Sequence, residues 1–229
     1  MSTTITGISS MATRPVLADL AAAYRARTGV EVAIESVGGV DAARRVLAGE
    51  AFDVVVLASD AIARLAAAGR VIAGSEAALV HSGVAVAVRA GAALPDLGSE
   101  DAVRAAVLAA RSLSYSTGPS GVQLARLFER WGIADQIASR FVQAPPGVPV
   151  GSLVARGEVD LGFQQLSELL PLPGIEIIGP LPPAIQITTT FTAAVCTAAA
   201  QPDAARALLA FLQSPEAAEA KRRHGMDPA

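Results

Sequence analysis

One pattern occurs twice in this chain: a Gly-Glu pair, an Asp, a short apolar run and then polar residues. The first copy is Gly49-Glu50-Ala51-Phe52-Asp53-Val54-Val55-Val56-Leu57-Ala58-Ser59-Asp60, and the second is Gly157-Glu158-Val159-Asp160-Leu161-Gly162-Phe163-Gln164-Gln165-Leu166-Ser167-Glu168. In each copy we expect the glycine to end a helix in the left-handed conformation, which costs glycine little. A buried strand follows, and polar side chains stand at its carboxyl end. Two such segments predict two similar α/β lobes, with a small ligand in a cleft at the ends of the strands.

The composition narrows the classes of partner. The chain has 229 residues, which suits one large domain or two of about 100 residues each. Its net charge of −3 offers no basic surface, so we expect no nucleic-acid partner. The apolar runs are short and interrupted, so we expect no membrane insertion.

The residues that commonly hold metals or act as nucleophiles are scarce. Cys196 is the only cysteine and follows an apolar run, so we expect a buried, unreactive thiol. His81 and His224 are the only histidines, and neither lies in a recognisable motif. We therefore expect no metal site and no cofactor.

The amino terminus leaves the compartment open. The segment after Met1 lacks the basic region and the apolar run of a secretory leader. The protein is expected to be cytoplasmic if Met1 is its native start, and periplasmic if a leader has been removed.

Helical and strand patterns alternate along the chain. Leu17, Leu20 and Tyr24 mark one face of a helix over 14–28, which Gly29 closes. The alternation predicts an α/β fold of two doubly wound lobes. We place lobe one at residues 1–82 plus 188–229 and lobe two at 83–187, with hinge segments near 82–88 and 186–190.

Polar groups are predicted at the junctions where strands meet helices. Hydroxyls and backbone N–H groups at helix N-termini bind anions without a cationic side chain. The same residue types also serve as ordinary helix caps, and that alternative stays open for each of them. The candidates in these junctions are Ser9, Ser10, Ser59, Tyr115, Ser116, Thr117, Ser120, Gln164 and Gln165.

Two further features flank these junctions. Gly118 and Gly121 lie in a predicted tight loop, 117–121, which would let backbone approach a ligand closely but lacks the Gly-Lys-Ser/Thr ending of a P-loop. Arg14, Arg44 and Arg45 could pair with a ligand carboxylate, or lie on solvated helix faces.

These segments, taken in order, resemble the molybdate-binding-protein-like solute-binding proteins, the type II receptors of ABC importers. The resemblance covers essentially the whole chain and implies two hinged lobes that close on an oxyanion. It adds Gly38, Gly39, Ala58 and Val150 to the candidate ligand contacts. An importer permease would be a partner if the protein is exported.

The chain departs from the molybdate pattern at two positions. Gly38-Gly39 stands where molybdate binders offer a serine, and Gln165 stands where they offer a tyrosine. These changes favour a larger, carboxylate-bearing ligand over tetrahedral molybdate.

The segments 162–171 and 179–183 resemble more closely a subgroup that includes aconitate isomerase. That activity moves a double bond in a tricarboxylate, which requires a group that transfers protons. Glu168 and Tyr115 are the candidates, although Glu168 is also a plausible first-turn helix carboxylate. Two functions therefore remain: a receptor that captures a small polycarboxylate by hinge closure, and an isomerase on the same scaffold.

Overall fold

The computed structural model describes residues 4–145 and 147–229, so the first three residues of our lobe one, and residue 146 of our lobe two, lie outside the described residues. These residues form two compact units. Unit 1 comprises the described residues up to Ser82 and from Thr189 to the end, and unit 2 comprises Gly83–Thr188. The chain passes from one to the other inside β4 (Ala77–Arg89) and at the start of β8 (Thr188–Val195).

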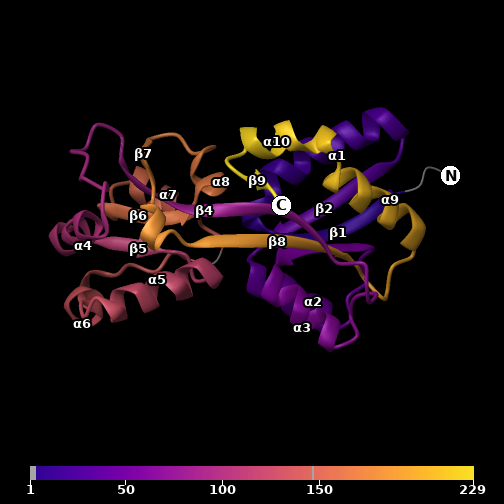
Figure 1. Cartoon of the computed structure of the whole chain (residues 1–229), viewed down its shortest axis with the longest axis horizontal. Coiled ribbons are helices and arrows are strands. Elements are labelled where there is room, and N and C mark those ends of the chain that lie inside the picture. The colour runs from indigo at the N-terminus through magenta and orange to yellow at the C-terminus, as the bar shows by residue number, and fades with distance from the viewer. Residues whose placement is uncertain (1–3, 146) are drawn as a thin grey trace. The chain divides into compact units, whose positions relative to one another are not determined.

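Unit 1 is a sheet covered by helices on both faces (Figure 1). Its strands follow the order β2-β1-β3-β8-β4, in which β1, β2 and β3 are mutually parallel and β8 is antiparallel to β3. Its elements, besides β4 and β8, are β1 (Thr4–Ser10), α1 (Arg14–Thr28), β2 (Glu31–Val37), α2 (Gly39–Leu47), β3 (Val54–Ala58), α3 (Ser59–Ala67), α9 (Pro202–Gln213), α10 (Ala218–Arg223) and β9 (Asp227–Pro228).

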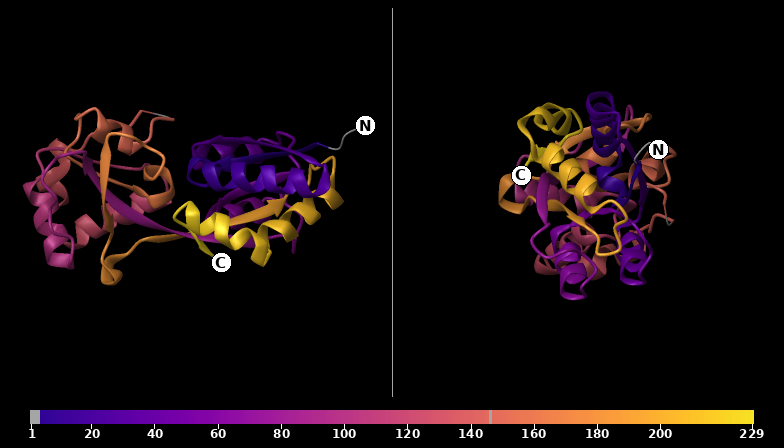
Figure 2. Two further views of the ribbon diagram at one scale, coloured as in Figure 1. Left: turned by 90° about the horizontal axis from the view of Figure 1, so that it is seen from above. Right: turned by 90° about the vertical axis from the view of Figure 1, so that its right-hand side faces the viewer.

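Side chains of β3 point alternately to the two faces of the sheet, and each face is covered by its own layer of helices. Val54 and Val56 pack in the cluster with α1, α9 and α10, whereas Val55 and Leu57 pack in the cluster with α2 and α3. Successive side chains of a strand point to opposite faces, so an uninterrupted apolar run is the pattern expected of a strand buried on both sides. Figure 2 shows the yellow C-terminal helices beside the indigo α1.

Unit 2 repeats the design with a shorter sheet. Its strand order is β4-β6-β5, with β5 parallel to β6, and β7 pairs with β4. Val84, Val86 and Val88 of β4 face the cluster of α4, α5 and α6, while Ala85 and Ala87 face Leu169 of α8 on the other side. Its elements are α4 (Glu100–Ala109), β5 (Leu113–Tyr115), α5 (Pro119–Arg130), α6 (Ala134–Ile137), α7 (Val150–Ala155), β6 (Leu161–Gln165), α8 (Leu166–Leu169) and β7 (Ile175–Pro180).

The α/β prediction is confirmed, and the repeated glycines behave as expected. Gly49 has φ = 89° and Gly157 has φ = 72°, both in the left-handed region. The prediction of a loop over 117–121 is partly wrong, because α5 begins at Pro119 and includes Ser120 and Gly121. Proline is favoured in the first turn of a helix, where its missing N–H would have no partner.

Candidate functional site

The candidate residues of unit 1 gather at the carboxyl ends of its parallel strands, here called polar edge 1. Ser9 lies opposite Ser36 of β2 and Val56 of β3 in the strand register. Because these strands are parallel, their carboxyl ends share one edge of the sheet. Polar edge 1 contains Ser9, Ser10, Gly38, Gly39, Ala58 and Ser59.

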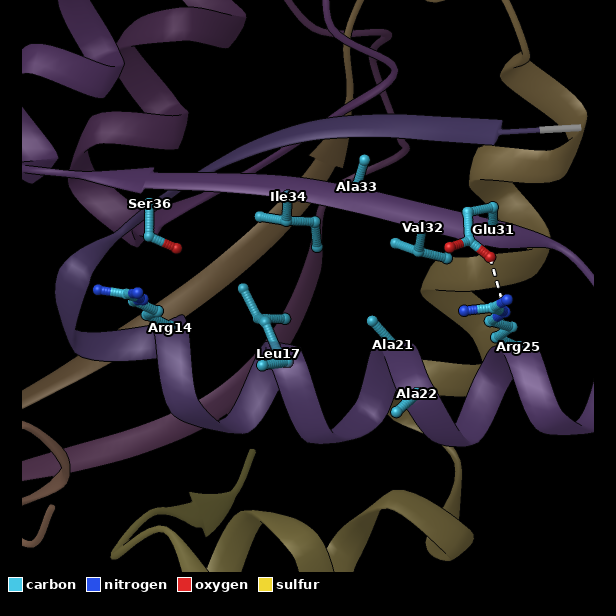
Figure 3. A pocket seen from close by; sticks show the side chains of 11 residues that line it. Arg14, Leu17, Ala21, Ala22, Arg25, Glu31, Val32, Ala33, Ile34 and Ser36 are labelled. Carbon is cyan, nitrogen blue, oxygen red and sulfur yellow. Dashed lines mark ion pairs between the residues drawn. The ribbon is translucent and has the colours of Figure 1, made fainter.

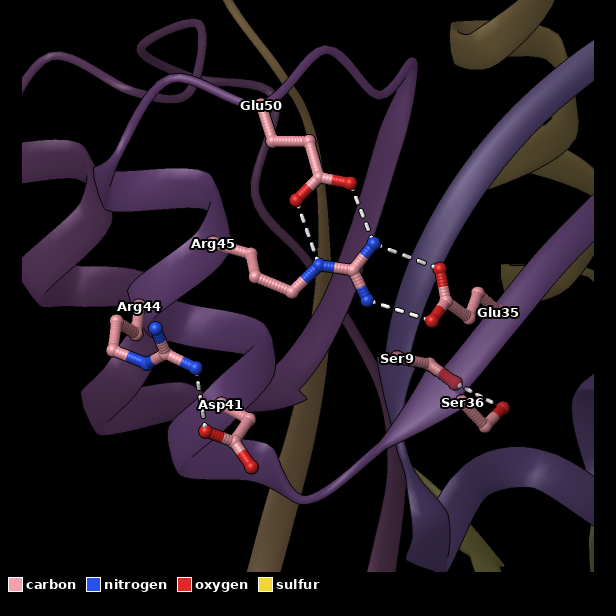
Figure 4. Close-up of polar contacts among 7 residues, drawn as sticks. All are labelled: Ser9, Glu35, Ser36, Asp41, Arg44, Arg45 and Glu50. Carbon is pink, nitrogen blue, oxygen red and sulfur yellow. Dashed lines mark hydrogen bonds and ion pairs between the residues drawn. The ribbon is translucent and has the colours of Figure 1, made fainter.

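Three serine hydroxyls lie at polar edge 1: those of Ser9, Ser10 and Ser36. Ser9 Oγ and Ser36 Oγ lie 2.8 Å apart (Figure 4), and Ser9 Oγ also donates to the carbonyl of Ser10 at 3.3 Å. Ser10 Oγ is buried and has no hydrogen-bond partner among the described residues. A Cβ on Gly39 would lie 3.6 Å from the Cβ of Ser10, so this hydroxyl lies close to the N-terminus of α2. A buried hydroxyl without a partner is costly and marks a place where a ligand group or water can bind.

Ser36 is a site residue that the sequence reasoning missed. We took Gly38-Gly39 as the second strand end and inferred that a hydroxyl is lost there. The structure has a hydroxyl two residues earlier, at Ser36, paired with Ser9. The available signal was its position as the last polar residue of an alternating strand.

The two helices that begin at polar edge 1, α2 and α3, both lack a side-chain cap at their N-termini. The N-cap positions of α2 and α3 are Gly38 and Ala58, and neither has a side-chain cap. Ser59 Oγ instead lies 2.7 Å from Thr192 Oγ1 and donates to the carbonyl of Thr190 at 3.1 Å. The alternative of Ser59 as an ordinary N-cap of α3 is therefore wrong, because its hydroxyl bonds to β8.

Two of the three arginines near this edge are neutralised. Arg45 pairs with both Glu35 and Glu50, and Arg44 Nη2 lies 3.0 Å from Asp41 Oδ1 (Figure 4). The pKa values of the Glu35 and Glu50 carboxyls are lowered by their hydrogen bonds to Arg45. Arg14, in contrast, has no carboxylate partner among the described residues.

The candidate residues of unit 2 gather in the same way, at polar edge 2. Tyr115 at the end of β5 pairs in register with Phe163 of β6, so the loop after β5 lies at the same edge as Gln164 and Gln165. Ser116 Oγ lies 3.1 Å from Ser120 Oγ in the first turn of α5. Polar edge 2 contains Ser116, Thr117, Ser120, Val150, Gln164 and Gln165.

Gln164 connects this edge to a carboxyl group. Its Oε1 accepts the backbone N–H of Gly151 at 3.2 Å, and its side chain hydrogen-bonds Glu168. Burial raises the pKa of Glu168 to about 7, against the lowering effect of that hydrogen bond. A carboxyl that titrates near neutral pH is suited to proton transfer.

Tyr115 lies in an aromatic cluster beside this edge. Its ring centroid is 4.3 Å from that of Phe141 and 5.8 Å from that of Phe128. Burial, together with the negative charge of Glu129, raises the pKa of its hydroxyl. A tyrosine with a raised pKa is a proton donor rather than a base at neutral pH.

The thiol of Cys196 takes no part in either edge. Burial, with the charge of Asp53, raises its pKa to about 12, so it stays protonated. Within the described residues, no group of three or more His, Cys, Asp or Glu side chains could hold a metal ion. No helix in the described ranges is long and apolar enough to cross a membrane.

Comparison with known proteins agrees with this architecture. The family described as bacterial extracellular solute-binding protein matches residues 5–227. The chain belongs to this family. Over 232 aligned residues this solute-binding protein is 39% identical to an aconitate isomerase of Pseudomonas sp., covering 99% of the chain and 88% of that protein.

Solved structures of similar fold include receptors for small anions. The periplasmic molybdate-binding protein of Azotobacter vinelandii has a TM-score of 0.80 at 21% identity, covering 97% of this chain and 98% of that one. The sulfate-binding protein of Mycobacterium tuberculosis has a TM-score of 0.80 at 19% identity, covering 99% of this chain and 87% of that one. At these identities the likeness establishes the type II periplasmic binding protein fold.

Proposed function

We propose that this solute-binding protein binds aconitate and moves its double bond, as an aconitate isomerase. The single observation that carries the proposal is Glu168, a carboxyl that is hydrogen-bonded to Gln164 of polar edge 2 and whose pKa is raised by burial to about 7. A receptor for a polycarboxylate gains nothing from a carboxyl at its site, because like charges repel. An enzyme that moves a proton needs such a group.

The reaction balances without a cofactor. Ionised Glu168 takes a proton from the methylene carbon of aconitate, and the electron pair of that C–H bond becomes part of a delocalised dienolate. The proton then returns to the carbon that was vinylic, so the double bond has moved by one position. No atom is gained or lost, and nothing is oxidised or reduced.

The neutral donors of polar edge 2 supply the stabilisation that the dienolate requires. The dienolate carries its developing charge on carboxylate oxygens, and hydroxyl, amide and backbone N–H donors stabilise charge at such positions. Ser116 and Gln165, which lie in unit 2 with Glu168, are the donors we assign to this role. The 39% identical aconitate isomerase supports the same substrate class.

A receptor without chemistry is the second candidate. It is favoured by the fold, which the chain has in common with molybdate- and sulfate-binding proteins, and by the hydroxyl-rich strand ends. In that case the ligand would be a small polycarboxylate, and an ABC importer permease would be the partner.

The two candidates are separated by one experiment in deuterium oxide. Purified protein is mixed with cis-aconitate, and the formation of trans-aconitate with its deuterium content is followed by proton NMR. We expect turnover in the unaltered protein and its loss, with binding retained, in Glu168→Gln. The control is Glu176→Gln, an exposed carboxylate of β7, which should keep full turnover. Binding of aconitate without conversion would support the receptor and overturn the isomerase.

A further inference from the structure

Two features lie outside the reaction proposed above: a cavity in unit 1 and a buried amide in unit 2. The cavity has a volume of about 400 Å³ and lies between α1 and β2 (Figure 3). Arg25 Nε lies 2.8 Å from Glu31 Oε2 at one end of it, and Ser36 is hydrogen-bonded to Ser9 at the other, beside the exposed Arg14. None of the buried polar atoms that lack a partner in the described residues lines this cavity, so it indicates no ligand.

The buried amide belongs to Gln164, and both of its polar atoms are engaged. Gln164 lies at the carboxyl end of β6 and is 4% exposed. Its Oε1 accepts the backbone N–H of Gly151 at 3.2 Å, and its side chain also hydrogen-bonds the carboxyl of Glu168. An amide offers an acceptor oxygen and a donor NH₂ group, so these two contacts place different demands on it.

The bond to Gly151 determines which way the amide points. Gly151 is the second residue of α7, and its N–H is one of the first-turn donors that have no partner within the helix. A reversed amide would turn its NH₂ group towards that N–H, so that two donors would face each other. The NH₂ group of Gln164 therefore points to Glu168 and donates to a carboxylate oxygen.

Two glycines bring the N-terminus of α7 to this amide. A Cβ on Gly162 of β6 would lie 2.6 Å from Val154 Cγ2 of α7, and a Cβ on Gly151 would lie 2.6 Å from Leu172 Cδ1. Side-chain atoms cannot approach this closely without displacing their neighbours. The helix can lie against β6 because neither residue has a side chain, and this packing places the Gly151 N–H beside Gln164.

Charged neighbours do not take the place of Gln164 in the part of the chain that the structure describes. The elements of unit 2 beside α8 are β4, β6, β7 and α7. Their charged residues in this unit are Arg89 at the end of β4 and Glu176 on β7. Neither shifts the pKa of Glu168, which burial raises and the bond from Gln164 lowers. A hydrogen bond to the ionised form of a carboxyl stabilises that form.

We propose that Gln164 is a positioning residue, which orients the carboxyl of Glu168 for proton transfer and does not touch the ligand. This inference rests on the proposed function, because it takes Glu168 to be the base. The amide binds one carboxylate oxygen and leaves the other to accept the proton. It also favours the ionised form of Glu168, which is the form that acts as a base.

Two substitutions separate the orientation of Glu168 from the support of α7. Gln164→Glu keeps an oxygen that accepts the Gly151 N–H, but it replaces the donor to Glu168 by a second carboxyl oxygen. Gln164→Met removes both contacts at similar volume. Gln136→Met is the matched control, because Gln136 is an exposed glutamine of α6 in the same unit. Circular dichroism establishes that each variant is folded, and Gln164→Glu decides alone if Gln164→Met does not fold.

The measurements are the pH dependence of aconitate turnover and the pKa of Glu168, from NMR of ¹³C-labelled glutamate carboxyls assigned with Glu168→Gln. We expect Gln164→Met to shift both upward by about 1–2 pH units, which matches the loss of a hydrogen bond to a charged group. Its KM for aconitate should stay within about twofold, since Gln164 does not touch the ligand. Gln164→Glu should lose most turnover at neutral pH, because two adjacent carboxyls then share a proton. Gln136→Met should match the unaltered protein.

The opposite outcomes are distinct. An unchanged turnover profile in Gln164→Glu overturns the inference and leaves the proposed function intact, since Gln164 would then serve only to support α7. A raised KM with an unshifted profile also overturns it, because Gln164 would then be a ligand contact. If the unaltered protein does not convert aconitate, the proposed function fails and this inference fails with it.

Discussion

Asp53 and Thr6 are joined by two hydrogen bonds to one carboxylate oxygen. The Thr6 backbone N–H donates to Asp53 Oδ2 at 2.8 Å and the Thr6 hydroxyl donates to it at 2.9 Å, while Gln201 N–H donates to Oδ1 at 2.8 Å. The aspartate of the repeated pattern thus ties the start of β3 to β1 and to the segment before α9. In the second copy, Asp160 accepts bonds from the backbone and guanidinium of Arg111. The aspartate has a structural role in both copies.

Asp53→Asn should therefore destabilise the fold. Burial alone would raise the pKa of Asp53, but its hydrogen bonds hold that pKa below the usual range. The stabilisation is complete above the unfolded-state pKa of about 3.9 and is lost as pH falls through the lower folded-state pKa. We expect a loss of roughly 1–3 kcal/mol in urea unfolding at pH 7. The difference in stability between the unaltered protein and the variant should shrink as the pH falls through the lowered folded-state pKa of Asp53, and a difference that stays constant over that range would contradict this origin.

Glu168 should give stability the opposite pH dependence. Its pKa is raised to about 7 on folding, so the folded state holds its proton more tightly than the unfolded state does. The contribution of protonated Glu168 to the free energy of unfolding is complete below about pH 4 and is lost as the pH rises through about 7. Thermal unfolding of Glu168→Gln should show a gain of about 1–3 kcal/mol at pH 8 relative to the unaltered protein, and little gain at pH 4. A gain that is equal at both pH values would show that burial does not shift this carboxyl.

Gly121→Ala should disrupt the start of α5. A Cβ at this position would lie 1.5 Å from the carbonyl oxygen of Ser116, which is backbone and cannot turn away. The glycine is thus required by the loop itself rather than by a ligand. We expect a loss of more than about 2 kcal/mol in denaturant unfolding. Gly118→Ala is the matched control, because its Cβ would meet only Ser116 Oγ, at 4.0 Å. Equal stability of the two variants would argue against this steric requirement.

Lys221→Met should stabilise the protein. Lys221 is the only lysine in the chain and is 2% exposed, and burial lowers its pKa. Protonation therefore favours the unfolded state. The loss of folding stability begins below the unfolded-state pKa of about 10.4, grows as the pH falls towards the folded-state pKa, and is constant below it. A rise of about 1 kcal/mol in the free energy of unfolding at pH 7 is expected, measured by chemical denaturation. Arg222→Met, an exposed neighbour, should leave that free energy unchanged. A destabilised Lys221→Met would show that the ammonium is well solvated.

Local patterns in the sequence predicted the long regular elements better than the short or interrupted ones. The helix expected over 14–28 is α1, with Gly29 at φ = 74° as its C-cap, because helix period and cap residue are both local signals. The first half of β4 was missed, since His81, Ser82 and Gly83 interrupt its apolar alternation. The four-residue α8 is too short to show the apolar periodicity by which a helix is recognised in a sequence.

Long-range partners could not be predicted in the same way. The sequence around Arg45 does not indicate that its guanidinium will form hydrogen bonds with both Glu35, ten residues earlier, and Glu50. The partners of Asp53 lie 47 and 148 residues away in the sequence. Which arginines have a carboxylate partner depends on such contacts. That distinction required the structure.

The chain leaves unit 1 once and returns to it once, at Ser82 and Thr189. Unit 2 is therefore an uninterrupted insertion, whereas unit 1 is assembled from two distant pieces of the gene product. During synthesis, β1, β2 and β3 emerge long before β8 and α9, which complete their sheet and core. All residues of unit 2 have been synthesised before the second piece of unit 1 emerges. Unit 2 can therefore complete its fold first, even though synthesis of unit 1 begins earlier.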